Sequence, residues 1–236
     1  MKSRWEGQCD RGAAEEIHFI PTISCRAVLF DLDGVLVDSR ECIELIWHAW
    51  AGERGLVPAE FLRVAHGRRI AETLRLVAPQ LDAAAEAAVL DAMEEVETRG
   101  LRAAPGAAAL LRQLSEAQRA IVTSGSRPVA TLRLRTAGLP IPGVFVTAGD
   151  VQRGKPDPEG YLLAARRLGV APGDCVVVED SPPGVGAGKA AGMRVIALLT
   201  TYPAAALSVA DARLASLADL RIHVLASPST GLRLDF

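Results

Sequence analysis

The chain has 236 residues, half of them hydrophobic, and a formal net charge of −2. This length and composition suit one sizeable hydrophobic core, with room for a smaller attached domain. The weak net charge argues against nucleic acid as a partner, and no apolar run has the roughly 18 residues that a membrane-spanning helix needs.

The N-terminal residues and the cysteines indicate the cellular setting. Residues 1–24 are polar and lack the long apolar segment of a signal peptide, so we interpret them as an extension outside the fold that is compatible with disorder. The four cysteines are widely spaced, which argues against a zinc motif or a disulfide framework. We therefore expect a reduced, cytoplasmic setting, and we also expect a monomer or weak dimer without a membrane partner.

Short, almost uniformly apolar segments predict strands that are buried on both faces of a parallel sheet. These segments are residues 26–31, 119–123, 144–147, 175–179 and 194–198. Helical patterns, each beginning near a proline, lie between the later strands at residues 106–117, 128–137, 158–169 and 182–191. This alternation predicts an α/β fold with a parallel, Rossmann-like sheet and crossover helices.

One region interrupts the alternation. Residues 38–104 show no strand pattern and contain helical segments at residues 39–54, 58–65, 69–78 and 82–98. We therefore predict an all-helical cap domain, residues 38–104, inserted into an α/β core made of residues 25–37 and 105–236. A cap at the carboxyl end of a strand would lie over the edge where such sheets bind ligands.

The segment VLFDLDGVLVDS, residues 28–39, places two carboxylates at the end of the first predicted strand. Asp31 and Asp33 are two positions apart, so both side chains can face one cavity. They repel each other unless a cation or a shared proton intervenes. Gly34 permits a sharp turn. Because an Asp-Gly pair is also common in ordinary turns, this segment alone leaves a purely structural explanation open.

Two further polar segments follow later strands. In AIVTSGSRP, residues 120–128, Ser124 and Gly125 precede a predicted helix, where hydroxyls and free amides either bind an anion or simply cap the helix. In the loop GKPDPE, residues 154–159, Lys155 lies between a glycine and a proline. A lysine in a loop is usually solvated, but this rigid setting favours a defined position.

A fourth segment, VVVEDSPPGV, ends an apolar strand in Glu179 and Asp180. Charges at the end of a buried strand cost several kcal/mol unless they have a partner. All four segments lie at the carboxyl ends of predicted strands, which is the ligand-binding edge of a parallel sheet. Together they offer carboxylates for a hard cation, donors for an anion and one ammonium group. This combination suits a phosphate ester held beside Mg²⁺.

The four segments, in their order and spacing, resemble the four motifs of the haloacid dehalogenase superfamily of phosphatases over about residues 26–225. The helical insert is similar to the cap of the subgroup that includes β-phosphoglucomutase and small sugar phosphatases. The resemblance implies a Mg²⁺-dependent phosphatase. It would hydrolyse a small phosphorylated metabolite, most simply a sugar or polyol phosphate, through an aspartyl-phosphate intermediate.

The resemblance also implies catalytic roles. Asp31 would be the nucleophile, which splits one difficult step into two. Asp33 would first protonate the leaving oxygen and then activate water. Ser124, Gly125 and Lys155 would hold the phosphoryl oxygens, and Ser124 and Lys155 would be catalytic residues as well as substrate-binding ones.

The same resemblance implies a metal site. Asp31, the backbone carbonyl of Asp33, and Asp180 would bind Mg²⁺, and Glu179 would support the ion directly or through water. An opposing positive charge would keep the nucleophile ionised.

Two alternatives to hydrolysis remain open, a phosphomutase and a non-catalytic module that binds a phosphorylated metabolite. β-Phosphoglucomutases carry a histidine ten residues after the acid/base aspartate and a lysine in the cap. Here that position is Ile43, and the chain's three lysines, at residues 2, 155 and 189, all lie outside the predicted cap. These departures favour hydrolysis over transfer. A binding module would have no need of Asp33.

Substrate choice should lie in the cap and in the linkers that join it to the core. The segment VAHGRRIAETLR, residues 64–75, resembles the specificity loop of sugar phosphatases, and His66, Arg68 and Arg69 are candidates to contact the substrate, although solvated side chains would also explain them. Trp47 and Trp50 share a helix face, which predicts core packing. The acids of EEVETRG, residues 94–100, are predicted to form a solvated face.

Overall fold

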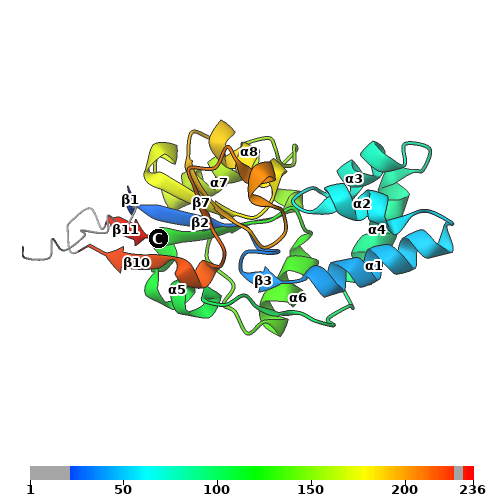
Figure 1. The fold of residues 1–236 in the computed structure, drawn as a ribbon, viewed down its shortest axis with the longest axis horizontal. Coiled ribbons are helices and arrows are strands. Elements are labelled where there is room, and N and C mark those ends of the chain that lie inside the picture. Colours follow the sequence, from blue (N-terminus) through cyan, green and yellow to red (C-terminus); the bar gives the residue numbers. More distant parts are fainter. Residues whose placement is uncertain (1–21, 226–230) are drawn as a thin grey trace, which may run out of the picture.

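The computed structural model describes residues 22–225 and 231–236 (Figure 1). Its main sheet has six parallel strands in the spatial order β6-β5-β2-β7-β8-β9. They are β2 (Ala27–Phe30), β5 (Arg119–Val122), β6 (Phe145–Val146), β7 (Cys175–Glu179), β8 (Arg194–Leu198) and β9 (Ala212–Leu214). Because β2 pairs with β5 and β7, residues that follow β2 lie near the middle of the carboxyl edge of the sheet.

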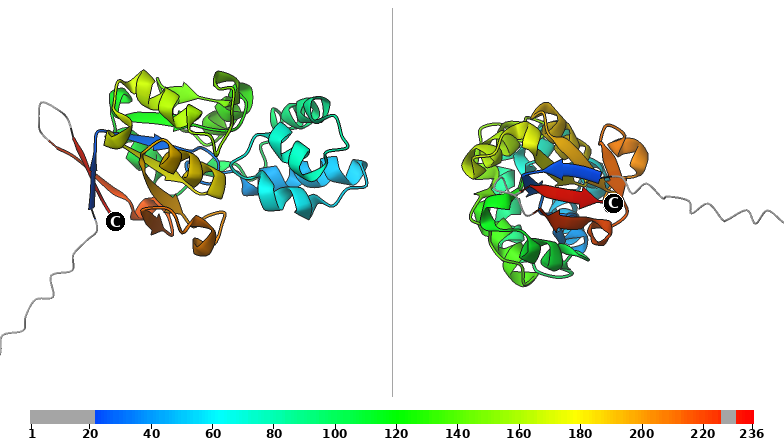
Figure 2. Two further views of the ribbon diagram at one scale, coloured as in Figure 1. Left: turned by 90° about the horizontal axis from the view of Figure 1, so that it is seen from above. Right: turned by 90° about the vertical axis from the view of Figure 1, so that its left-hand side faces the viewer.

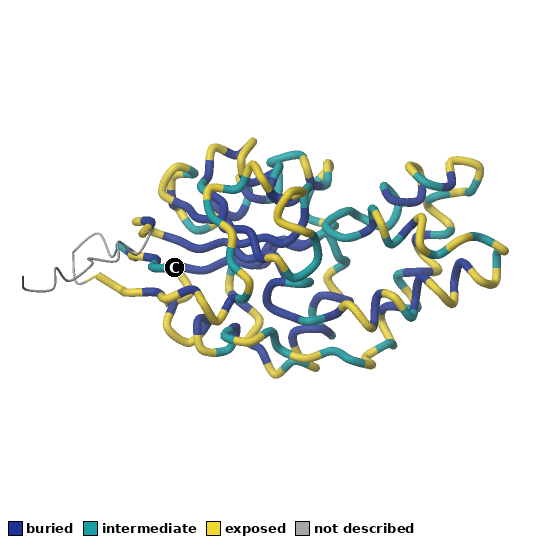
Figure 3. Tube along the Cα trace, viewed as in Figure 1, coloured by how far each residue is buried: buried dark blue, intermediate teal, exposed yellow. Residues whose placement is uncertain are grey.

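Helices cover both faces of this sheet, as expected for strands that are apolar throughout. They are α5 (Ala107–Gln113), α6 (Arg127–Thr136), α7 (Glu159–Leu168) and α8 (Pro182–Ala190). Val28 and Phe30 of β2 belong to the hydrophobic core that includes α5 and α6. Ala27 and Leu29 belong to the core that includes α7 and α8. Figure 3 shows the central strands as the most continuously buried part of the chain.

Four other helices stand together beyond the carboxyl edge of the sheet (Figures 1 and 2). They are α1 (Arg40–Glu53), α2 (Pro58–Ala65), α3 (Ile70–Val77) and α4 (Ala83–Glu94), and we call them the cap. The cap has its own hydrophobic core around Trp47, Trp50 and Phe61, whose ring centroids lie 5.2 to 5.5 Å apart. The prediction that both tryptophans pack in a core is confirmed.

A short ladder joins the cap to the core. Strand β3 (Val37–Asp38) pairs antiparallel with β4 (Arg102–Ala103), where the chain enters and leaves the cap. The predicted absence of strands from residues 38–104 is therefore wrong at both ends of the insert. Two-residue strands are too short to show a readable alternation of apolar and polar residues.

A second, antiparallel sheet lies at the opposite end of the core, in the order β1-β11-β10 (Figure 2). Its strands are β1 (Thr22–Cys25), β10 (Arg221–Val224) and β11 (Leu232–Asp235). The sequence-based assignment of residues 22–24 to a polar extension is therefore wrong, because they form most of β1 and pair with β11. Alternate burial explains why a partly polar segment forms a strand. The rest of that extension, residues 1–21, lies outside the described residues.

The five predicted strands and eight predicted helices all occur, with boundaries shifted by a few residues. The largest shifts are four residues, in the helices predicted at residues 82–98 and 106–117, which end at Glu94 and Gln113. The predicted α/β fold with a parallel sheet is confirmed. None of the described helices is both long enough and apolar enough to cross a membrane.

Candidate active site

The carboxyl ends of β2 and β7 bring charged groups together in the interior. Asp31 follows β2, and Glu179 ends β7 beside it. Lys155, from the loop before α7, donates hydrogen bonds to Oδ1 of Asp31 at 2.6 Å and to Oε1 of Glu179 at 2.5 Å. All three side chains are buried. The predicted convergence of Asp31 and Lys155 is therefore present in the fold, although 124 residues separate them in the sequence.

Glu179 is surrounded by donors on both carboxylate oxygens. Oε1 accepts from Lys155 and from the hydroxyl of Tyr161 at 2.9 Å. Oε2 accepts from the backbone amides of Asp180 and Ser181 and from the Ser181 hydroxyl, at 2.9 to 3.1 Å. Five hydrogen bonds to a fully buried carboxylate fix its position and compensate for its burial. The arrangement positions Lys155 firmly.

Gly34 is needed where two parts of the site meet. Its φ is +77°, and a Cβ at this position would overlap the carboxylate of Asp180. The Asp180 carboxylate also accepts a hydrogen bond from the Thr201 hydroxyl, and the Thr200 hydroxyl donates a hydrogen bond to the carbonyl of Gly34 at 2.7 Å. The glycine therefore lets the turn after β2 approach Asp180 closely. A residue with a side chain would strain this backbone conformation and would clash with the Asp180 carboxylate.

Asp33 lies between the core and the cap. One carboxylate oxygen accepts a hydrogen bond from Ser39 at 2.7 Å, and the other accepts one from Arg133 of α6 at 2.6 Å. Arg133 is buried and also pairs with Glu94, at the end of cap helix α4, over 3.1 Å. The predicted solvated face at residues 94–100 is therefore wrong for Glu94, because its side chain is buried against this arginine.

Ser124 and Gly125 form the turn between β5 and α6. The Ser124 hydroxyl donates to the carbonyl of Gly67 in the cap at 2.9 Å, and the Gly125 amide donates to the Thr123 hydroxyl at 3.1 Å. Gly67 has a φ of +81°, and a Cβ there would overlap the Ser181 hydroxyl. The cap loop therefore rests directly on two turns of the site.

A cavity of about 200 Å³ opens between the core and the cap. Seven of the sequence-predicted site residues line it, namely Asp31, Asp33, His66, Arg68, Arg69, Ser124 and Gly125. The other three, Lys155, Glu179 and Asp180, do not line it. Lys155 instead borders a smaller pocket of about 20 Å³ that shares Thr123 and Ser124 with the cavity.

The three predicted cap residues have different surroundings. His66 faces Tyr202 edge to face with ring centroids 6.4 Å apart, and burial lowers the pKa of its imidazole. Arg68 donates to the carbonyl of Val64, in the last turn of cap helix α2, at 3.0 Å. Arg69 donates to two backbone carbonyls of the core loop at residues 151–152, at 2.9 and 3.1 Å.

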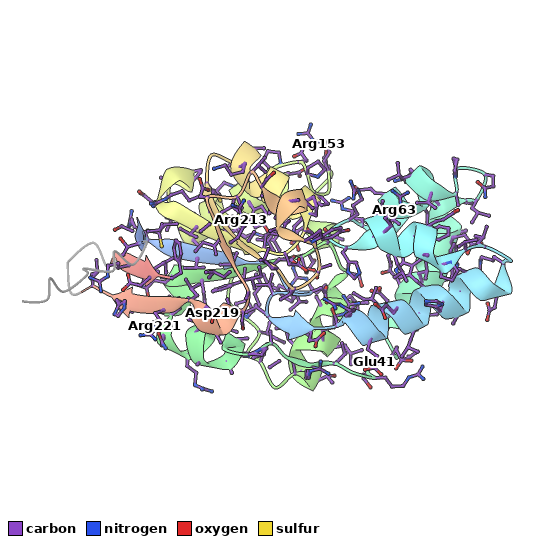
Figure 4. The ribbon with its side chains drawn as sticks, viewed as in Figure 1. Glu41, Arg63, Arg153, Arg213, Asp219 and Arg221 are labelled. Carbon is purple, nitrogen blue, oxygen red and sulfur yellow. The ribbon has the colours of Figure 1, made fainter. Side chains whose placement is uncertain are left out.

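Cap helix α3 strengthens the same contact with the core. Glu72 accepts a hydrogen bond from the amide of Gly154 at 3.2 Å, next to Lys155. A Cβ at Gly154 would overlap both Arg69 and Glu72, so the glycine permits close contact between cap and loop. The neighbouring Arg153 projects outward from the core loop, and its side chain is 76% exposed (Figure 4).

Burial dominates the ionisation of the acidic cluster. Removal from water raises the pKa of Asp31 to about 7, and the nearby Lys155 opposes this shift without overcoming it. Burial and the adjacent Glu179 likewise raise the pKa of Asp180 well above its usual value. The pKa of Lys155 is raised because two carboxylates face it, which outweighs its own burial. The cluster therefore has a deficit of positive charge.

The cluster has the composition of a site for a divalent cation. One oxygen from each of Asp31, Glu179 and Asp180 lies within 4.8 Å of the others. Carboxylate oxygens are the ligands that Mg²⁺ prefers, and a cation would relieve the unfavourable burial of these acids. Hydrogen bonds from the described residues occupy both oxygens of Glu179, but they involve a single oxygen of Asp31 and of Asp180. Asp31 and Asp180 are thus better placed than Glu179 for direct binding.

Sequence reasoning missed Arg133, Tyr161 and Thr201, which bond Asp33, Glu179 and Asp180 respectively. Arg133 and Tyr161 lie inside amphipathic helices, where a polar residue is most simply explained by exposure to solvent. No local pattern identifies their partners, which are 100 and 18 residues away.

Comparisons with known proteins agree with this geometry. A family model described as haloacid dehalogenase-like hydrolase matches residues 25–192. The chain is 48% identical over 203 residues to hexitol phosphatase A of Escherichia coli (strain K12), covering 84% of this chain and 94% of that protein. It is 34% identical to glycerol-1-phosphate phosphohydrolase 2 of Saccharomyces cerevisiae, covering 77% of each.

Solved structures show the same architecture. A CbbY variant from Rhodobacter sphaeroides, in complex with xylulose-(1,5)bisphosphate, superposes with a TM-score of 0.70 and 26% identity, covering 83% of this chain and 96% of that one. The shared fold, the match over most of the core and cap, and the closely similar phosphatases lead to one assignment. The chain belongs to the haloacid dehalogenase-like hydrolase family, among its phosphoric monoester hydrolases.

Proposed function

We propose that this protein is a Mg²⁺-dependent phosphatase that hydrolyses the phosphate ester of a small sugar or polyol through an aspartyl-phosphate. The observation that carries the proposal is the hydrogen bond of 2.6 Å between Lys155 and Asp31, at the point where Asp31 also borders the cavity beneath the cap. A carboxylate beside a fixed ammonium can attack phosphorus while the ammonium attracts the phosphoryl oxygens.

In the first step, a carboxylate oxygen of Asp31 forms a bond to phosphorus and the bond from phosphorus to the ester oxygen breaks. Asp33 in its protonated form gives a proton to the departing oxygen. In the second step, Asp33 accepts a proton from water, the water oxygen bonds to phosphorus, and the bond from phosphorus to Asp31 breaks. Free phosphate and the unmodified Asp31 result. Asp33 suits both steps because it borders the cavity beside Asp31.

Lys155, Ser124 and the turn at Gly125 would hold the phosphoryl oxygens. Ser124 can turn its hydroxyl from the carbonyl of Gly67 toward a phosphate. Asp31, Asp180 and the backbone carbonyl of Asp33 would bind Mg²⁺, which supplies positive charge near the phosphate when bound. Glu179 would act on this site through the hydrogen bonds that position Lys155 and Asp180.

The relatives support the substrate class, since they include a hexitol phosphatase and a glycerol-1-phosphate phosphohydrolase. The cap forms one side of the cavity, where His66 and Arg68 can contact the part of the substrate beyond the phosphate. A screen of phosphate release over a broad panel of sugar and polyol phosphates, with Mg²⁺, tests the proposal. Absence of release from every member of the panel would overturn it. Tight binding without turnover would instead identify a non-catalytic binding module.

A phosphomutase is the alternative enzyme. Ile43, at the position where β-phosphoglucomutases carry a histidine, lines the cavity and is buried. The described cap helices contain no lysine. We therefore expect phosphate release to exceed isomerisation of any hexose 1-phosphate, and the opposite ratio would establish the mutase.

Stabilisation by Mg²⁺ should depend on pH. Burial raises the pKa of Asp31 from 3.8 to about 7, so the folded protein holds this proton more tightly than the unfolded chain does. The resulting contribution to the free energy of unfolding is complete below about pH 4 and is lost as the pH rises through about 7. Mg²⁺ binds the deprotonated acid and offsets the loss. We expect the increase in Tm on adding Mg²⁺ to be several degrees at about pH 8 and to be nearly absent at about pH 5. An equal shift at both values would contradict a carboxylate site.

A further inference from the structure

Buried polar atoms without hydrogen-bond partners gather around one cavity. Among the described residues, five side chains have such atoms, namely Arg69, Thr73, Arg119, Ser126 and Arg133. All except Arg119 line the cavity between core and cap. Buried polar groups are nearly always hydrogen-bonded in folded proteins, so unpaired groups that share a cavity indicate a polar ligand.

The cap side of the cavity is polar in a specific way. Thr73 of α3 is fully buried, and its hydroxyl has no partner among the described residues. Asp91 and Glu94, one helical turn apart on α4, line the same space, and Arg133 contributes two nitrogen atoms that make no hydrogen bond. Glu94 lies 3.1 Å from one of them without the alignment of a hydrogen bond. We call these four residues the cap wall.

The cap wall offers both donors and acceptors. Carboxylates accept hydrogen bonds, a guanidinium donates them, and a threonine hydroxyl does both. A phosphate group would gain from Arg133 but would be repelled by Asp91 and Glu94. A hydroxyl can bond all of them because it both donates and accepts. The wall therefore fits neutral hydroxyls better than a second anionic group.

The size of the cavity agrees with this chemistry. Since a water molecule takes up roughly 30 Å³ in the liquid, about 200 Å³ accommodates a short carbon chain bearing several hydroxyls. Ile43 and Trp47 supply apolar surface beside the polar groups, as sugar and polyol carbon chains require.

We propose that Thr73, together with Asp91, Glu94 and Arg133, recognises hydroxyl groups on the carbon chain of the substrate and so selects hydroxyl-rich phosphate esters. This inference rests on the proposed phosphatase activity and assigns its specificity to the cap wall. A site that bonds substrate hydroxyls rejects compounds that lack them, because its buried groups then stay unpaired.

The decisive variant is Thr73→Val, which removes a hydroxyl and keeps the shape of the side chain. The ratio of kcat/KM for sorbitol 6-phosphate to kcat/KM for p-nitrophenyl phosphate, which has no hydroxyl, should fall by about tenfold. Thr98→Val, at an exposed cap position away from the cavity, should leave the ratio unchanged.

A merely structural role for Thr73 predicts a different pattern. If the hydroxyl only stabilised the fold, its removal would lower Tm and leave the substrate ratio as it is. A lower Tm with an unchanged substrate ratio would overturn the inference. An unchanged ratio with an unchanged Tm would do so as well.

A second pair of variants tests the carboxylates independently. Glu94→Gln should also lower the ratio of the two kcat/KM values, whereas Glu95→Gln should not, because Glu95 is exposed and does not line the cavity. Equal changes of the ratio in the two variants would contradict the inference. The two proposals can fail separately. If the wild type hydrolyses sorbitol 6-phosphate and both Thr73→Val and Glu94→Gln keep the wild-type ratio of kcat/KM values, the role of the cap wall is refuted and the phosphatase activity stands. Wild-type protein that releases phosphate from neither compound would refute the phosphatase itself.

Discussion

Replacing Asp31 by asparagine should reduce phosphate release by about four orders of magnitude or more while the protein stays folded. The amide keeps the size of the carboxylate and lacks the nucleophilic oxygen. Lys155 retains its hydrogen bond of 2.5 Å to Glu179, so its charge stays paired. Removal of one buried negative charge from a crowded acidic cluster also relieves repulsion.

Phosphate release and thermal unfolding should be measured on the same preparation of Asp31→Asn. Asp174→Asn is a matched control, because it makes the same chemical change at an exposed position before β7. The control should retain full activity. Retention of more than about a tenth of wild-type activity by Asp31→Asn would show that this carboxylate does not attack phosphorus.

Lys155→Met should lower the free energy of unfolding by about 3–5 kcal/mol at about pH 8 without Mg²⁺. Its ammonium lies 2.6 Å from Asp31 and 2.5 Å from Glu179, and all three groups are buried. Methionine fills similar space but leaves the carboxylates without their cation. Phosphate release should also be lost, because the proposed ligand of the phosphoryl oxygens is absent.

The pH dependence separates an electrostatic loss from a packing loss. The pKa of Lys155 is raised, so its ammonium stays charged in both the folded and the unfolded state below about pH 10. The change with pH therefore comes from the carboxyls. As they become protonated below about pH 7, the cost of the missing ammonium should decrease. Urea unfolding at several pH values measures this, and a loss that is constant with pH would indicate packing alone.

Lys189→Met provides the contrast for this experiment. Lys189 pairs with Asp211 at 2.8 Å, but its side chain is 38% exposed. Exposed pairs contribute at most about 1 kcal/mol, so this variant should unfold almost like the wild type and retain activity. A similar loss for both lysines would mean that burial does not control the contribution of Lys155.

The chemistry of the site depends on contacts between core and cap. Ser124 bonds the carbonyl of Gly67, Arg69 bonds the loop at residues 151–152, and Glu72 bonds the amide of Gly154. These bonds use backbone groups next to the proposed phosphate ligands Ser124 and Lys155. The cap therefore directly contacts the turns that would hold the phosphate.

The candidate core site was largely predictable because its residues lie at strand ends. A buried parallel strand shows a run of apolar residues, and its carboxyl end defines one edge of the sheet. Asp31 and Asp180 could therefore be expected in one place from the pattern of strands, whereas Lys155 reaches them from a longer loop before α7. The strand at residues 22–25 was missed because half of its residues are exposed, which resembles a polar loop.

The cap wall could not be predicted, because its members come from three helices and meet only in the fold. Glu94 looked like part of a solvated run, yet it is buried against Arg133, a residue of core helix α6. Helical periodicity indicates which face of a helix is apolar, but it does not specify which distant helix supplies the partner of a polar residue.

The sequence by itself determined the α/β architecture, the helical insert and the acidic strand ends, since each depends on residues that are close together along the chain. Only the tertiary structure decided which oxygens of Glu179 already accept hydrogen bonds, which arginine bonds Asp33, and which cavity-lining residues have buried polar atoms without partners among the described residues. Those features depend on distances between residues far apart in the chain, which are set when the cap packs onto the sheet.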